Sequence, residues 1–115
     1  MERISRGDIW TIELVNHPKP RPGLIVSIDA VNDLCPDVLV IPITTHAGPL
    51  RVRLPEQPAQ TGLRAAGYAK CESLGPLHKS RLRVRIGSLP PRAWETVDAG
   101  MRRVLGLRDS NPIGP

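Results

Sequence analysis

Hydrophobic and polar residues alternate over several short segments of the chain, a pattern typical of half-buried β-strands. The alternating segments are residues 7–14, 51–54 and 82–86. In the first, Trp10, Ile12 and Leu14 form the apolar face. In the last, Arg83 and Arg85 face away from the apolar residues. We expect each segment to form a strand, with residues 51–54 as an exposed one.

Two continuous apolar runs, residues 24–28 and 38–43, are rich in β-branched side chains and predict strands buried on both faces. Residues 68–72 predict a further short strand with Lys70 and Glu72 on one face. Three prolines make residues 16–23 a stiff, non-helical loop. Residues 55–62 predict a second, polar loop.

The only helical pattern considered lies near the C-terminus. An apolar stripe at helical spacing follows Pro90 and Pro91 and consists of Trp94, Val97, Met101 and Val104. Gly106 is suited to end the helix, and residues 109–115 are expected to fray. Six short strands and one terminal helix favour a mainly β fold, a small and strongly bent barrel in a single domain of residues 1–108.

Composition narrows the function classes. The chain has 115 residues, a length that fits one domain. Its only aromatic residues are Trp10, Tyr68 and Trp94, so the core must be aliphatic. Proteins that stack several bases on aromatic rings, such as RNA-recognition and OB-type domains, are therefore nearly excluded.

Targeting and redox signals point to the cytoplasm. No apolar run approaches the roughly 20 residues that cross a bilayer, and the N-terminus lacks the apolar segment of a signal peptide, so we expect no membrane association. Cys35 and Cys71 are isolated, and with scattered histidines they do not predict a zinc site. We interpret both thiols as buried and apolar rather than as a disulfide.

Charge is distributed unevenly along the chain. The net charge is +5, but residues 1–50 carry −2 and residues 51–108 carry +8. Arginine outnumbers lysine 13 to 3, and its planar guanidinium suits bidentate contact with phosphate. The basic half indicates a nucleic acid or an acidic protein as partner.

Several short motifs occur in an order that resembles the MazF/PemK/Kid toxins of bacterial toxin–antitoxin systems. The motifs are Arg6-Gly7-Asp8-Ile9-Trp10, Arg21-Pro22-Gly23, Val40-Ile41-Pro42-Ile43-Thr44-Thr45, Gly62-Leu63, Lys70-Cys71-Glu72-Ser73, Lys79-Ser80-Arg81-Leu82 and Ile86-Gly87-Ser88-Leu89. The resemblance implies an SH3-like barrel, a homodimer and a sequence-specific endoribonuclease that cuts single-stranded messenger RNA. It also implies neutralisation by a cognate acidic antitoxin.

The resemblance assigns the central catalytic roles to Arg21 and Thr44. Cleavage by attack of the RNA 2′-OH needs a base, an acid and positive charge beside the phosphate. The Arg21 guanidinium would hold the phosphate, and the Thr44 hydroxyl would bond a phosphate oxygen. The competing interpretations are a solvated loop charge for Arg21 and a turn hydroxyl that bonds its own backbone for Thr44.

Other residues are candidates for acid–base chemistry or RNA binding. Lys70 and Glu72 match a motif in which some relatives have Arg and Asp, and a same-face ion pair is the alternative. His17 lies near the place where some relatives carry a histidine, but Pro-Lys-Pro replaces their neighbouring segment, and a surface-loop role is the preferred interpretation. Thr45, Ser73 and Arg81 are further candidates. His46 and His78 are interpreted as surface-loop residues.

Three function classes remain open at this point. The first is a metal-independent endoribonuclease toxin without a cofactor, which the Arg21 and Thr44 motifs favour. The second is a catalytically silent SH3-like module that binds nucleic acid, and the third is a gyrase-inhibiting toxin on the same barrel. No carboxylate cluster indicates a metal site.

Overall fold

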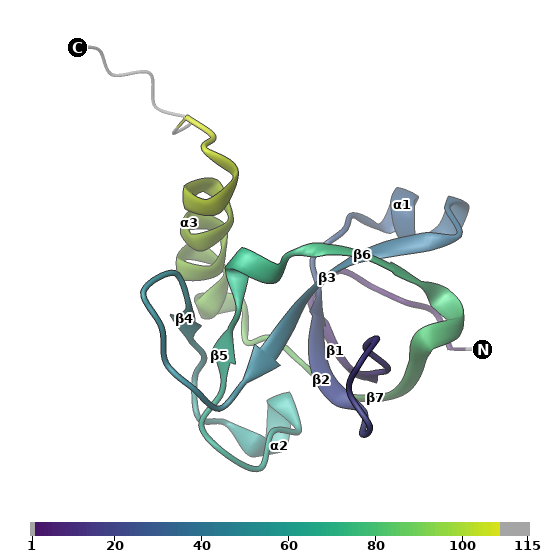
Figure 1. Cartoon of the computed structure of the whole chain (residues 1–115), viewed down its shortest axis with the longest axis horizontal. Helices are drawn as coiled ribbons and strands as arrows, with labels where there is room; N and C mark the ends of the chain where they lie inside the picture. The colour runs from purple at the N-terminus through teal and green to yellow at the C-terminus, as the bar shows by residue number, and fades with distance from the viewer. Residues whose placement is uncertain (1, 109–115) are drawn as a thin grey trace.

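An antiparallel sheet curls on itself beside a C-terminal helix (Figure 1). The computed structural model describes residues 2–108. Its strands are β1 (Asp8–Ile12), β2 (Arg21–Ile25), β3 (Asp37–Thr44), β4 (Val52–Arg53), β5 (Tyr68–Ala69), β6 (Gly75–His78) and β7 (Leu82–Ser88). Its helices are α1 (Asp29–Leu34), α2 (Pro58–Thr61) and α3 (Trp94–Leu105), with 3₁₀ turns η1 (Cys71–Ser73), η2 (Lys79–Arg81) and η3 (Pro91–Ala93). The frayed tail expected at 109–115 lies outside the described residues.

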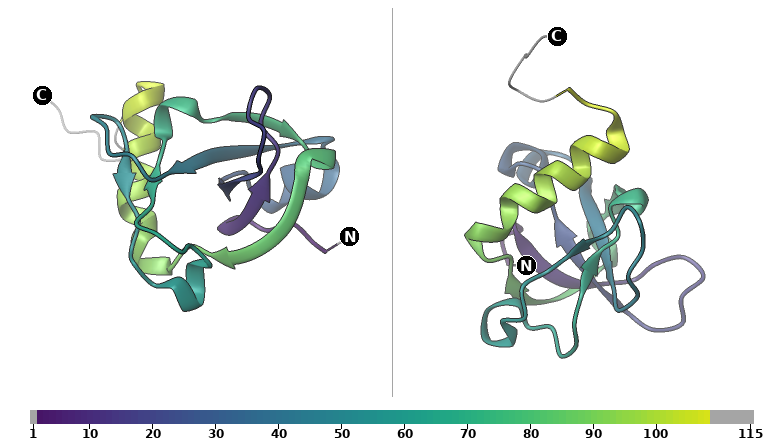
Figure 2. Two further views of the ribbon diagram at one scale, coloured as in Figure 1. Left: turned by 60° about the horizontal axis from the view of Figure 1, so that its bottom comes forward. Right: turned by 90° about the vertical axis from the view of Figure 1, so that its left-hand side faces the viewer.

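Strand β3 organises the sheet. The order is β4-β5-β3-β2-β1-β7, and β6 also pairs with β3. One edge of β3 pairs with β2, whereas its other edge pairs first with β6 and then with β5. The turn η2 then carries the chain to β7, which pairs with β1. Figure 2 (left) shows β6 and β7 arching around β1. The predicted mainly β, barrel-like fold with a C-terminal helix is confirmed, and the barrel is left open between β6 and β7.

Two hydrophobic clusters occupy the two faces of this curled sheet. The inner cluster consists of Ile4, Trp10, Ile12, Ile25, Val38, Val40, Leu77 and Leu82. The outer cluster lies under α3 and includes Ile9, Leu24, Ile41, Ile43, Leu54, Cys71 and Val97. Because successive strand residues point to opposite faces, neighbours such as Ile9 and Trp10 belong to different clusters. The strand expected at 7–14 to be half-buried is therefore buried on both faces, since Ile9 is buried on one face and Trp10 on the other.

The C-terminal helix matches its prediction. Helix α3 follows Pro90 and η3, and Val97 is fully buried within its apolar stripe. Gly106 ends it with a left-handed φ of 67°, and its N–H donates to the carbonyls of Arg102 and Arg103. That geometry is the usual glycine termination of a helix.

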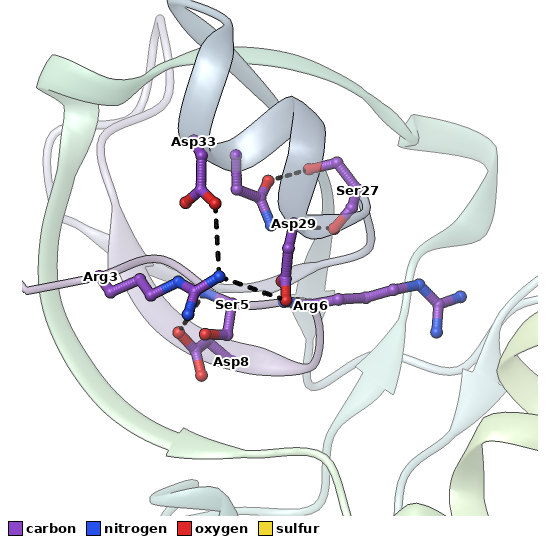
Figure 3. Close-up of polar contacts among 8 residues, drawn as sticks. Arg3, Ser5, Arg6, Asp8, Ser27, Asp29 and Asp33 are labelled. Atoms are coloured by element: carbon purple, nitrogen blue, oxygen red, sulfur yellow. Dashed lines mark hydrogen bonds and ion pairs between the residues drawn. The ribbon is translucent and has the colours of Figure 1, made fainter.

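The N-terminal segment pairs with α1, as Figure 3 shows, and also with α3. Helix α1 is not predicted from the sequence. Its Asn32 side-chain amide donates to the Ser27 carbonyl at 2.9 Å and so fixes the start of the helix. Arg3 pairs with Asp33 on the same helix. Arg6 extends away from this cluster to Asp98 of α3, with its guanidinium 3.8 Å from the centre of the Trp94 ring.

Several predicted boundaries are wrong. Strand β2 begins at Arg21, inside the loop expected at 16–23, and ends at Ile25 instead of reaching Ile28. The pairing of β2 with β1 extends the strand over Pro22, whose missing N–H falls near the strand start. The strand expected at 51–54 is reduced to β4, and its supposedly exposed segment ends in the buried Leu54.

Two further expectations about burial and conformation are corrected. The strand expected at 68–72 stops at Ala69, because the chain turns into η1 at Cys71. Cys71 is buried as expected, but Cys35 is exposed at the end of α1. Burial, with a smaller contribution from Glu72, raises the pKa of the Cys71 thiol.

Replacing Gly100 by alanine should destabilise the fold. A Cβ atom at this position would lie 2.8 Å from both Cys71 Sγ and Val52 Cγ2. Overpacking costs about 1–3 kcal/mol, which exceeds the gain of about 1 kcal/mol from alanine in a helix. Urea denaturation of G100A should show a lower free energy of unfolding. The control A99G, at an exposed neighbouring position, tests helix propensity alone; a G100A protein more stable than wild type would contradict the packing argument.

Candidate active site

Arg21 and Thr44 come together because of the register between two neighbouring strands. Gly23 of β2 pairs with Pro42 of β3, and continuing this antiparallel register by two residues places Arg21 opposite Thr44. On the other side of β3, Thr44 pairs with Tyr68 of β5. The N–H of Lys70, just beyond β5, donates to the Pro42 carbonyl at 2.8 Å. Three adjacent strands thus deliver these residues to one end of the sheet.

This end of the sheet is polar because the inner core stops there. Along β3, alternate positions lead from the buried Val38 and Val40 through Pro42 to Thr44. The Ile12 side chain fills the space beside Gly23, where a Cβ atom would be 2.8 Å from Ile12 Cδ1. Beyond this apolar plug the same face carries Arg21 and Thr44, so both functional groups lie at the mouth of the inner core.

Three cavities adjoin this mouth. One of them, of about 240 Å³, is lined by Leu14, His17, Arg21, Pro42, Ile43, Thr44, His46 and Lys70. A second, of about 430 Å³, shares His17, Pro42 and Lys70 with it and extends to Glu13, Ser73, His78 and Arg81. We call these two cavities together the site groove. A third cavity, of about 200 Å³, also borders Arg21 and Thr44 and extends to Thr45 and residues 63–67.

The structure brings together most of the candidate residues. Arg21, Thr44, His17 and Lys70 line the smaller cavity of the site groove. Ser73 and Arg81 line the larger one. Thr45 lines the third cavity. Glu72 lines none of the three. The chemical roles suggested for these residues stay predictions.

Glu72 forms an ion pair, though not with Lys70. Its carboxylate accepts a hydrogen bond from Arg51 Nε at 3.0 Å. Desolvation would raise the pKa of Glu72, but a backbone hydrogen bond and the Arg51 guanidinium together hold it below its ordinary value. The expected same-face pair with Lys70 is absent among the described residues, because η1 turns the backbone between them.

His46 is a groove residue that the sequence interpretation missed. Its N–H donates to Thr44 Oγ1 at 3.2 Å, and its ring Nδ1 lies 3.5 Å from the same oxygen. The hydroxyl therefore does accept from its own backbone, as the turn interpretation of Thr44 expects, while still lining the cavity. The sequence does offer one signal for His46, its position two residues after Thr44, because a threonine hydroxyl commonly accepts a hydrogen bond from the N–H two positions on.

Some of the arginines in the second half of the chain are neutralised by ion pairs. Arg83 pairs with Glu13, and Arg85 donates to the buried Asp8 at 3.0 Å. Within residues 2–108, Arg21, Lys70 and Arg81 form no ion pair, so three cations of the site groove remain available to an anion. Residues 2–108 contain no cluster of three potential metal ligands. They also contain no helix that is long and apolar enough to span a membrane.

Comparison with known proteins identifies the family. A sequence profile described as the PemK-like, MazF-like toxin of type II toxin–antitoxin systems matches residues 5–105. The chain belongs to this toxin family. No curated protein gives a significant match to this toxin.

Solved structures resemble the toxin over nearly its whole length. One, an endoribonuclease in complex with its cognate antitoxin from a mycobacterial species, is 26% identical, with a TM-score of 0.77 over 95% of this chain and 99% of that chain. The Mycobacterium tuberculosis toxin MazF-mt6 is 23% identical, with a TM-score of 0.76 over 89% and 99%. A MazE–MazF complex from Deinococcus radiodurans is 21% identical, with a TM-score of 0.75 over 94% and 100%. The last two support the fold.

The Arg51–Glu72 pair should contribute stability that depends on pH. Because the folded toxin lowers the pKa of Glu72, the contribution is present above the ordinary glutamate value of 4.5 and is lost as the pH falls through the lowered value. Urea denaturation should therefore show a difference between wild type and E72Q at pH 7 that shrinks at pH 3. The control E56Q removes a more exposed pair with Arg53. A wild type–E72Q difference that does not shrink at pH 3 would contradict the assignment.

Proposed function

We propose that this PemK/MazF-like toxin is a sequence-specific endoribonuclease that cuts single-stranded messenger RNA without a metal ion. Family membership and the resemblance to a mycobacterial endoribonuclease support the reaction class. The observation that carries the proposal at the residue level is the meeting of Arg21 and Thr44 at the mouth of the inner core, in a cavity that also holds Lys70.

The reaction uses the substrate's own nucleophile. The 2′-oxygen attacks the adjacent phosphorus, the bond from phosphorus to the 5′-oxygen breaks, and a cyclic phosphate and a free 5′-OH result. Charge grows on the phosphate oxygens during this step, and preorganised cations and donors stabilise such charge strongly. The Arg21 guanidinium offers two parallel N–H donors to those oxygens. The Thr44 hydroxyl and the Lys70 ammonium supply further donors from the neighbouring strands.

The groove also accounts for the expected substrate form. Bases read beside the scissile phosphate must be unstacked, as sequence-specific recognition of RNA generally requires, and this favours single-stranded RNA. The cavities on either side of Arg21 and Thr44 are the places where flanking bases would be read. With few aromatic residues, this reading would depend on arginine planes and backbone groups.

The partners proposed are an antitoxin and a second copy of the chain. Two of the similar structures are toxins bound to antitoxins, and the cations of the site groove would attract an acidic antitoxin segment. A domain of this size buries a limited fraction of its surface and gains from pairing, which favours a homodimer. Messenger RNA as substrate places the activity in the cytoplasm.

Removing Arg21 should abolish most of the activity. Purified toxin should cut single-stranded RNA at a short sequence in EDTA, and R21A should be slower by about 10²-fold or more, as is usual for loss of a transition-state donor. Single-turnover gel assays measure the rate. R92A removes one arginine outside the site groove and should cut at the wild-type rate. A folded R21A protein with wild-type activity would refute this role, and RNA binding without cutting by the wild type would indicate a binding module.

The 2′-OH at the cut should be indispensable. Replacing only the ribose 5′ of the scissile phosphate by deoxyribose removes the nucleophile but leaves the phosphate charge intact. Cleavage should stop, while the dissociation constant measured by fluorescence anisotropy should change little. The all-ribose oligonucleotide serves as control, and the dissociation constants of both oligonucleotides are compared on the same inactive R21A protein. Cutting of the singly substituted oligonucleotide at the same phosphate would exclude 2′-OH attack.

A further inference from the structure

The proposed RNA cleavage needs a group that accepts the 2′-OH proton, and this inference rests on that proposed function. Lysine and arginine side chains are already protonated at neutral pH and can only donate. The two carboxylates nearest the site groove are engaged elsewhere, because Glu13 pairs with Arg83 and Glu72 pairs with Arg51. The remaining acceptors that line the smaller cavity are the imidazoles of His17 and His46.

Geometry separates these two histidines. His46 follows Thr44 by two residues, and two contacts join it to the Thr44 hydroxyl, the N–H bond at 3.2 Å and the ring Nδ1 at 3.5 Å. His17 lies in the β1–β2 loop, and within residues 2–108 its ring forms no hydrogen bond; only its N–H is held, by the Leu14 carbonyl at 3.2 Å. When Nδ1 faces the Thr44 hydroxyl, Nε2 is the ring nitrogen left free for a substrate.

Two charged residues, Arg51 and Glu72, hold the main chain of His46 in place. Arg51 Nη1 donates to the His46 carbonyl at 2.9 Å, while Arg51 Nε donates to Glu72 at 3.0 Å. Gly48 makes room for this arrangement, since a Cβ atom there would be 3.0 Å from Arg51 Cδ and Nε. The Arg51 N–H also donates to the Gly48 carbonyl. The loop from Thr44 to Arg51 is therefore tied to η1 through Glu72.

We propose that His46 is the proton acceptor of the cleavage reaction and that Arg51 and Glu72 are positioning residues that act through it. His46 takes the 2′-OH proton as the 2′-oxygen forms its bond to phosphorus. The bond from phosphorus to the 5′-oxygen then breaks, and this oxygen takes a proton from the Lys70 ammonium. Exchange with water returns the imidazolium and the amine to their starting states, so no further reactant is consumed. Glu72, a sequence candidate for acid–base chemistry, thus contributes as an anchor.

The first test removes the imidazole and supplies it again from solution. H46A should cut RNA about 10²–10⁴-fold more slowly in single-turnover assays, the usual contribution of a general base. Added imidazole should restore part of the rate to H46A but not to R21A. The acidic limb of the wild-type pH–rate profile should be absent in H46A without imidazole. Since Arg21, Lys70, His17 and Arg51 also face this region, H17A provides the comparison and should keep that limb.

The second test separates positioning from chemistry. E72Q should lower kcat several-fold with little change in KM, whereas E56Q, which breaks the more exposed pair with Arg53 of β4, should leave both unchanged. If Glu72 acts through His46, the E72Q change should have no further effect in an H46A background. Equal losses from E72Q in both backgrounds would overturn the positioning role.

The outcomes distinguish this inference from the proposed function. If wild type fails to cut RNA, the proposed function itself is wrong. If wild type cuts and R21A does not, but a folded H46A keeps the wild-type rate and pH profile, only the role of His46 is overturned. A slow H46A that imidazole does not rescue, with its acidic limb retained, would also overturn the role, since it would indicate a structural contribution.

Discussion

The double use of one edge of β3 is the constraint on which the rest of the toxin depends. A single strand edge pairs first with β6 and then with β5, so the segment between them must leave the sheet briefly and rejoin it. That departure is η1, which lifts Cys71 into the outer cluster and turns Glu72 toward Arg51. Without it, Lys70 and Glu72 would continue as a flat strand, and the site groove would lack one wall.

The distribution of charge follows from the same arrangement. Carboxylates of β1 and its neighbourhood neutralise the arginines of β7, including the bond from Arg85 to the buried Asp8. Trp10 and the N–H of Ser5 also donate to Asp8, so its carboxylate is satisfied on all sides. The cations that line the site groove have no such partners among the described residues. Net charge along the sequence therefore does not show which cations can bind an anion, because pairing between strands neutralises part of it.

Much of the fold and part of the site can be predicted from the sequence, for identifiable reasons. Alternation and β-branched runs locate the strands, and the apolar stripe with Gly106 locates α3. The motif resemblance selects Arg21 and Thr44, which share the mouth of the inner core. These features depend on local pattern or on short motifs, which a sequence displays directly.

The remaining features depend on contacts between distant segments. Cys35 is exposed and Glu72 is paired with Arg51, 21 residues away, and neither fact has a local signature. Helix α1 is held by Ser27 and Asn32 rather than by an apolar stripe. His46 looks like any loop histidine until the loop is closed by Arg51. The pairing of β2 with β1 likewise overrides the loop signal of Pro22.

The close approach of α3 at Gly100 has a consequence for how this sequence can diversify. The helix backbone rests on Cys71 and Val52, and Cys71 directly precedes Glu72 in η1. Side-chain volume at position 100 therefore limits where η1 lies, and with it Glu72, which pairs with Arg51. Exposed side chains around the site groove lie outside this contact and can be exchanged without disturbing it. We therefore expect variable side chains around the site groove, combined with a strict limit on side-chain size at position 100.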